Sequence, residues 1–126
     1  MTIDELTAQG FVPGPAAYFN KPVFVKTLVA ADDITNCNVI EVYFEAGCRN
    51  NWHIHASNQI LLVKEGVCYY QEDGKPVQKV PSGGVINVLP GIKHWHGASP
   101  EAPMIHTAIN INTEKGMVTW LEAVED

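Results

Sequence analysis

The hydrophobic positions along the chain fall into short runs that alternate with polar residues, a pattern typical of β-strands. The clearest example is the run 39–45, in which Ile40, Val42 and Phe44 fall on one face and the residues between them on the other. The pattern predicts strands over residues 23–30, 39–45, 59–65, 67–72, 76–80, 85–89 and 106–112. Residues 118–124 fit a strand and a short helix equally well.

Turn and cap signals separate these runs. Asp73 and Gly74 form the strongest hairpin signal in the chain. Thr2 and Glu5 have the spacing of a capping box, which predicts a short helical turn near the N-terminus, and the Pro-Gly-Pro segment 13–15 ends any helix. About eight short strands with such punctuation indicate an all-β sandwich or barrel, which also hides strand edges.

Composition and charge narrow the classes of function. The 126 residues are enough for one domain, and with 46% hydrophobic and 17% charged residues the chain can bury a core. The net charge of −6 makes nucleic acid an unexpected partner. No apolar run is long enough to span a membrane, and residues 1–10 lack the pattern of a signal peptide. The three cysteines are widely spaced without a CxxC motif, so we expect a reducing cytoplasm and no disulfide framework.

The histidines carry the candidate chemistry. Four of the five form two pairs, His53 with His55 and His94 with His96, and the fifth is His106. Residues two apart in a strand point to the same side, so His53 and His55 can direct both imidazoles into one space. In the second pair, either both side chains do the same or one is a ligand and the other lies at the rim. A divalent transition metal is therefore the expected cofactor.

The spacing around the first pair resembles the first motif of the cupin superfamily: Gly47, five residues, His53, one residue, His55, three residues, Gln59, six residues, Gly66. The second cupin motif is matched by Gly83 and by the segment 90–94, which ends at His94. The resemblance covers roughly residues 24–112. It implies a single-domain, all-β cupin, that is, a double-stranded β-helix or jelly-roll barrel. The domain would span 1–126, with an N-terminal arm over about 1–22, the barrel over about 23–112 and a C-terminal segment over 113–126.

The chain has Gln59 where most cupins have glutamate. Three neutral imidazoles and a neutral amide would leave the charge of a divalent cation uncompensated. Such a cation is a stronger Lewis acid, and it attracts an anionic oxygen into its open positions. Amide oxygens do coordinate hard cations, so the substitution is compatible with a metal site.

A smaller group of cupins is more similar still. Glutamine in the first motif and the run 94–98, His-Trp-His-Gly-Ala, resemble bacterial manganese-dependent hydroxynitrile lyases and carboxymuconolactone-decarboxylase-like cupins. This resemblance implies that His53, His55, Gln59 and His94 hold the metal and that His106 lies next to the substrate. It also implies manganese, although the ligand types suit iron, cobalt, nickel and zinc as well.

The expected function is therefore that of a metal-dependent enzyme, a lyase acting on a small hydroxy or oxo compound by deprotonating a metal-bound oxygen, with decarboxylase or isomerase chemistry as relatives of that reaction. His106 is the candidate base, and His96 is a base, a rim residue or a partner of another site residue. Two alternatives stay open: an oxygen-using cupin dioxygenase, and a module that binds a metal or small ligand without catalysis.

A small, partly apolar or aromatic substrate is expected to contact a set of pocket residues: Ile40, Val42, Asn50, Trp95 and Asn110. We also expect a homodimer, because small barrels of this kind resemble dimers in which an N-terminal strand crosses to the partner. The apolar segment 16–29 suits that role.

Overall fold

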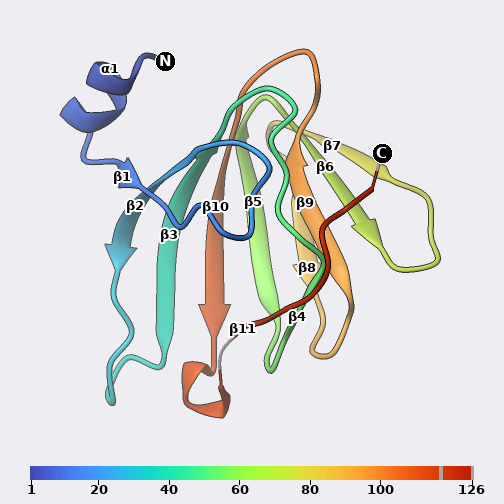
Figure 1. Ribbon diagram of the computed structural model, residues 1–126. Helices are drawn as coiled ribbons and strands as arrows, with labels where there is room; N and C mark the ends of the chain where they lie inside the picture. The colour runs from blue at the N-terminus through green and yellow to red at the C-terminus, as the bar shows by residue number, and fades with distance from the viewer. Residues whose placement is uncertain (117, 126) are drawn as a thin grey trace.

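The computed structural model describes residues 1–116 and 118–125, and the regular elements of this part of the chain are almost all strands (Figure 1). The helical elements are α1 (Ile3–Ala8) and the 3-10 turn η1 (Thr113–Lys115). The strands are β1 (Val12–Pro13), β2 (Val23–Val29), β3 (Cys37–Phe44), β4 (His53–His55), β5 (Gln59–Glu65), β6 (Val67–Glu72), β7 (Gln78–Pro81), β8 (Val85–Val88), β9 (His94–Ala98), β10 (Met104–Ile111) and β11 (Val118–Trp120).

The strands form two antiparallel sheets around a shared interior (Figure 1). One sheet has the order β1-β2-β3-β10-β5-β8 and the other β11-β4-β9-β6-β7. Neighbouring strands are mostly distant in sequence, as in a jelly roll, and the predicted all-β fold is confirmed. Within the described residues, no helix combines the length and the apolar character needed to cross a membrane.

The predicted strands agree closely with the observed ones. β5 and β6 have the expected bounds, and the other predicted strands are found with their ends shifted by one or two residues. The undecided run 118–124 begins with β11, a strand. β1, β4 and β9 were not predicted as strands, because two are very short and β9 carries histidines and glycine in place of an apolar run.

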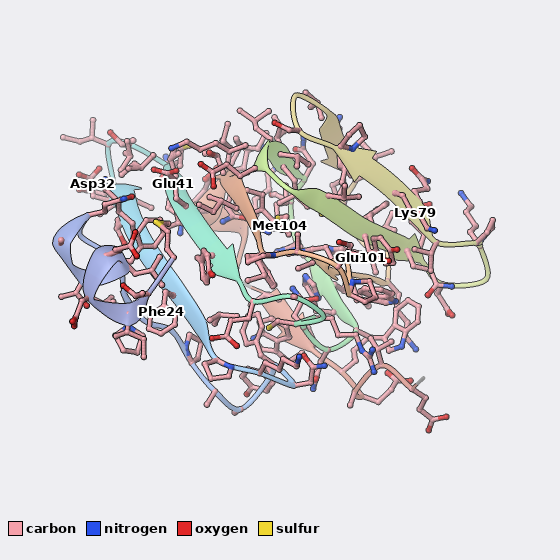
Figure 2. All side chains as sticks on the ribbon, turned by 90° about the horizontal axis from the view of Figure 1, so that it is seen from above. Phe24, Asp32, Glu41, Lys79, Glu101 and Met104 are labelled. Carbon is pink, nitrogen blue, oxygen red and sulfur yellow. The ribbon has the colours of Figure 1, made fainter. Side chains whose placement is uncertain are left out.

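Alternation along the strands creates two hydrophobic clusters. Residues such as Phe44 and Leu61 point between the sheets and are fully buried there. Phe24 and Tyr43 point to the outer face of the larger sheet, where they pack with Leu6 of α1 (Figure 2). The helix begins with the predicted capping box: the Glu5 backbone N–H donates to Thr2 Oγ1 over 3.1 Å, and Thr2 N–H donates to Glu5 Oε1 over 3.2 Å.

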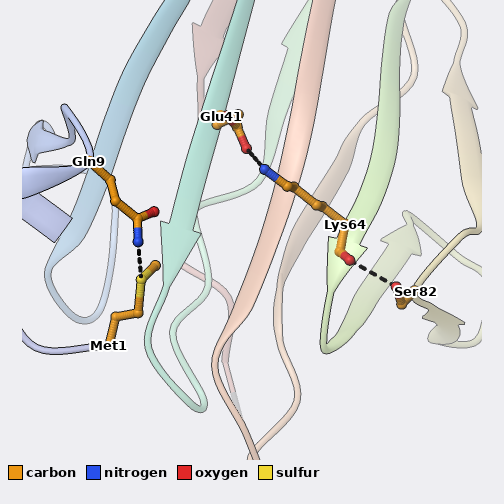
Figure 3. Close-up of polar contacts among 5 residues, drawn as sticks. All are labelled: Met1, Gln9, Glu41, Lys64 and Ser82. Carbon is orange, nitrogen blue, oxygen red and sulfur yellow. Dashed lines mark hydrogen bonds and ion pairs between the residues drawn. The ribbon is translucent and has the colours of Figure 1, made fainter. Parts of the chain in front are cut away.

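A buried carboxylate ties together the strands that will matter for the site. Glu41 on β3 is 7% exposed and accepts a hydrogen bond from Lys64 Nζ of β5 over 2.8 Å (Figure 3). The same lysine accepts a bond from Ser82 Oγ at its backbone carbonyl. Because β10 lies between β3 and β5, this ion pair spans three neighbouring strands.

Gly97 allows the loop before β4 to approach β9 closely. A Cβ atom at this position would lie 2.3 Å from the carbonyl oxygen of Cys48, too close for any other residue. The contact is closed by Ala98 N–H donating to Cys48 O over 2.8 Å and by Asn50 N–H donating to His96 O over 3.2 Å. The loop is thereby held against the histidine strand.

All three cysteines are free thiols, as expected. Cys48 and Cys68 are fully buried, and burial raises the pKa of their thiols to about 11 and about 12. At neutral pH both are therefore protonated and act as small apolar core residues.

Candidate metal centre

The five histidines gather between the two sheets. His53 and His55 come from β4 and His94 and His96 from β9, and His106 comes from β10 in the opposite sheet. His53 and His94 are directly paired across their strands, and their ring centroids are 4.1 Å apart. One ligating nitrogen each from His53, His94 and His96 lie within 4.8 Å of one another, so this cluster could hold a metal ion.

Backbone carbonyls fix the orientation of two of these rings. The Nδ1 atoms of His53 and His94 lie 2.8 Å from the carbonyl oxygens of Asn51 and Ile92, respectively. A carbonyl oxygen can only accept, so both Nδ1 atoms carry the proton and both Nε2 atoms keep a free lone pair. This is the arrangement that metal-binding histidines adopt in proteins.

Three buried polar atoms beside the cluster lack any partner among the described residues. They are His55 Nε2, His94 Nε2 and Gln59 Oε1. Leaving such atoms unsatisfied costs about 1–3 kcal/mol each, so their grouping at one place calls for a binding partner. All three are lone-pair donors of the kinds that divalent transition metals bind, and the residues therefore fit a metal ion.

The electrostatics of the cluster keep its imidazoles neutral. Burial lowers the pKa of His53 to about 2, with further lowering by the neighbouring His94, and it lowers the pKa of His55 to about 4. The pKa of His94 is lowered as well, again mainly by burial. At neutral pH these rings are uncharged and their lone pairs are available to a cation.

His96 and His106 form a second, deeper group. His106 Nε2 lies 3.2 Å from His96 Nδ1. The Asn50 side chain contacts His96 twice: its Nδ2 lies 3.3 Å from the ring Nε2, and its Oδ1 accepts from the His96 backbone N–H over 3.0 Å. His96 is buried, so the rim position considered for it from the sequence is not the one it takes. His106 Nδ1 is buried without a partner, and burial lowers the pKa of this ring to about 4.

A cavity of about 560 Å³ opens beside His55 at one end of the barrel. Its wall includes Asn38, Ser57 and Asn110. Asp32, which is labelled in Figure 2, also lines it. A volume of this size lies in the range of small-molecule sites. Asn110 is thus the expected pocket residue that the structure brings to this cavity.

The other expected pocket residues lie elsewhere. Val42 belongs to the core between the sheets and Ile40 packs against it, while Asn50 contacts His96. Trp95 lies between two histidines on β9, and strand alternation turns it to the opposite face, where its Nε1 donates to Gln71 Oε1 over 2.8 Å. In the described part of the chain, these four residues are not among those lining the cavity.

Sequence reasoning missed an aromatic stack that covers the cluster. Trp120 is paired with His53 through β11 and β4, and the two rings are 4.7 Å apart. Tyr18 stacks on Trp120 as well, with centroids 4.5 Å apart and planes inclined by 4°. The available signal was a tryptophan in the run 118–124, whose secondary structure the sequence left undecided.

The fold of the chain is also found in solved structures. The chain superposes on a cupin-like protein from Thermotoga maritima with a TM-score of 0.87 and 37% sequence identity, covering 90% of this chain and 86% of that one. A cupin 2 conserved barrel domain protein from Rhodopseudomonas palustris shares the fold, with a TM-score of 0.73, 16% identity and coverage of 87% and 75%. No family model matches the sequence. The chain belongs to the cupin superfamily, as its two histidine motifs predict.

One relative of the chain is an enzyme with a named activity. The chain is 36% identical over 126 residues to the (R)-mandelonitrile lyase of Granulicella tundricola, an alignment that spans 100% of this chain and 96% of the relative. The resemblance to hydroxynitrile lyases inferred from the sequence is thus confirmed.

Proposed function

We propose that this cupin is a metal-dependent lyase that cleaves a small cyanohydrin into a carbonyl compound and hydrogen cyanide. The observation that carries the proposal is the group of unpartnered lone-pair donors, His55 Nε2, Gln59 Oε1 and His94 Nε2, of which His55 belongs to the wall of a cavity of small-molecule size. The full-length similarity to an (R)-mandelonitrile lyase indicates the reaction.

The proposed ligands of the ion are His53, His55, Gln59 and His94. His96 also lies near His53 and His94, but both of its ring nitrogens already contact protein groups, whereas the ligating atoms of His55, Gln59 and His94 have no partner in the described chain. Manganese is the ion suggested by the resemblance, and iron, cobalt, nickel and zinc suit the same donors. When bound, a divalent cation supplies Lewis acidity, which lowers the pKa of a hydroxyl group held against it.

His106 is the proposed base. Its ring is neutral at working pH because burial lowers its pKa to about 4. The proposal requires the tautomer in which His106 Nε2–H donates to His96 Nδ1, because only this tautomer leaves a lone pair on His106 Nδ1, the atom without a partner. The proton of the cyanohydrin hydroxyl passes to Nδ1, the carbon–oxygen double bond forms, and the carbon–cyanide bond breaks with its electron pair leaving on cyanide. Return of the proton to cyanide releases hydrogen cyanide and restores the neutral imidazole.

The direct test compares one protein in two metal states. Protein stripped with a chelator and reloaded with Mn²⁺ is expected to convert (R)-mandelonitrile to benzaldehyde and hydrogen cyanide, and the stripped protein is expected to match the protein-free background. Turnover is expected to be equal with and without oxygen, since the reaction is redox-neutral. Loss of turnover without oxygen would favour the dioxygenase. Tight Mn²⁺ binding with background conversion would favour a binding module.

We also propose that two copies associate through the free edge of the larger sheet. β1 covers β2 only opposite Phe24 and Val25, and Leu28 and Val29 beyond them are 47% and 41% exposed. An exposed apolar strand edge is a template for pairing with another chain. In the single chain β2 pairs with its own β3, so the contact would extend the sheet rather than exchange a strand.

The mass in solution tests this association. Light scattering is expected to give twice the chain mass of 13.8 kDa, and Leu28→Lys is expected to give a single chain. Leu89→Lys is the matched control, because Leu89 is 56% exposed but follows β8 at the opposite edge of the sheet. A wild-type monomer would contradict the proposal.

A further inference from the structure

A row of three amide side chains crosses the larger sheet next to the histidines. Asn38 on β3, Asn110 on β10 and Gln59 on β5 lie directly opposite one another in the strand register. Residues in such a row point to the same face and are close enough to interact. The row therefore links the wall of the cavity at Asn38 to the candidate metal ligand Gln59.

The hydrogen bonds along this row all run in one direction. Gln59 Nε2 donates to Asn110 Oδ1 over 2.9 Å, and Asn110 Nδ2 donates to Asn38 Oδ1 over 2.6 Å. At one end, Gln59 Oε1 is buried without a partner in the described chain. At the other end of the row stands the NH2 group of Asn38, a residue of the cavity wall.

The direction of the chain decides what each end offers. Turning all three amides over would preserve both hydrogen bonds, but it would present the Gln59 NH2 to the histidines and the Asn38 oxygen to the cavity. An NH2 group cannot bind a cation, whereas an amide oxygen can. Only the observed direction therefore suits a metal ion beside Gln59.

We propose that Asn38 and Asn110 are positioning residues: they hold the Gln59 oxygen towards the metal, and the same row of amides presents the Asn38 NH2 to an acceptor atom of the substrate, such as a nitrile nitrogen. The metal half rests on the ligand set proposed above, and the substrate half also rests on the proposed lyase function. A cation at Gln59 and an acceptor atom of the substrate at Asn38 both favour the same direction of the hydrogen bonds in the row. Binding of the metal and binding of the substrate therefore promote each other.

The metal half is tested with Mn²⁺ alone. Its affinity for the metal-free protein is measured from the electron paramagnetic resonance signal of the free ion. Asn110→Leu removes both bonds of the row, and the affinity is expected to fall about 10- to 100-fold, as for other residues that orient a ligand. Asn38→Leu is expected to weaken binding less, whereas Asn38→Asp still accepts from Asn110 and is expected to bind at least as tightly as wild type.

Asn58→Leu is the matched control for these variants. Asn58 lines the same cavity, but its side chain donates to Asn87 over 3.1 Å and lies outside the row. Its Mn²⁺ affinity is expected to equal that of wild type. Circular dichroism checks that each variant folds, and the two Asn38 variants decide the question should Asn110→Leu fail to fold.

Gln59→Leu separates the possible failures. If it weakens Mn²⁺ binding but Asn38→Leu binds as wild type does, the amide row is not a positioning device and the ligand set stands. If Gln59→Leu binds Mn²⁺ with wild-type affinity, the ligand set is wrong and the inference falls with it. Neither result depends on turnover of any substrate.

The substrate half is tested by binding of phenylacetonitrile, which carries the nitrile but no hydroxyl group, to the Mn²⁺-loaded protein. Asn38→Asp removes the NH2 donor while keeping the row intact, and phenylacetonitrile is expected to bind roughly 10-fold more weakly, the effect of losing one hydrogen bond in a partly buried site. Unchanged binding in Asn38→Asp would overturn the donor role of Asn38.

Discussion

Acidification from pH 7 to pH 5 is expected to destabilise the metal-free protein by several kcal/mol. The pKa values of His53, His55 and His106 are about 2, about 4 and about 4, against about 6.5 in an unfolded chain. Below about pH 6.5 these histidines become protonated in the unfolded chain, whereas in the folded protein they stay neutral down to about pH 4. Falling pH therefore favours unfolding. At pH 5 each of these rings lowers the free energy of unfolding by about 2 kcal/mol. The free energy of unfolding of a typical domain is about 5–15 kcal/mol, so the loss is a large part of it.

Urea denaturation at several pH values, in the presence of a chelator, measures this loss. Carboxylates such as Glu72 and Glu122, whose pKa values are lowered by hydrogen bonds, lose their contribution only below about pH 4.5, so the histidines dominate between pH 6.5 and 5. His106→Gln lacks one of the titrating rings, and its slope is expected to be smaller by about 1.4 kcal/mol per pH unit. A stability that stays constant down to pH 5 would contradict the burial of neutral histidines.

Replacing His106 with glutamine is expected to lower cyanohydrin cleavage by about 10²–10⁴-fold, the usual contribution of a general base. Glutamine fills similar space and can still bond His96, but it cannot take up a proton. The Mn²⁺ content after purification is expected to stay at the wild-type value, because His106 lies outside the proposed ligand set. Cleavage assays and elemental analysis of the same preparation give both numbers.

His94→Ala is the control for this experiment. It is expected to lose both metal and turnover, since His94 Nε2 is one of the unpartnered donors. If His106→Gln also loses the metal, His106 acts as a ligand or a structural residue. If it retains full turnover, another group is the base.

Much of the fold could be predicted because its signals are local. The alternation of Ile40, Val42 and Phe44 placed β3, and the capping box of Thr2 and Glu5 placed α1. The histidine motifs indicated the cupin fold and the clustering of the rings. The strand β4 escaped prediction because it is only three residues long, and β9 because histidines and glycine stand in place of an apolar run. The burial of these histidines depends on contacts with distant parts of the chain.

The pocket was harder to predict because side-chain contacts set it. Trp95 belongs to the motif but faces away from the histidines, and its indole N–H is satisfied by Gln71. Asn38 was overlooked although it precedes Ile40 by two residues and shares its strand face. Its importance comes from the register of β3 with β10, which brings it opposite Asn110 and which the pattern of either strand alone does not specify.

The pairing of Trp120 with His53 has a consequence for the order in which the molecule is assembled. During synthesis every histidine of the cluster leaves the ribosome before β11, which pairs with β4 and brings the indole against the His53 ring. A nascent chain lacking this strand holds all the imidazoles but not the surface behind one of them. The geometry of the centre is therefore complete only once β11 has paired with β4, so maturation of the site depends on this strand.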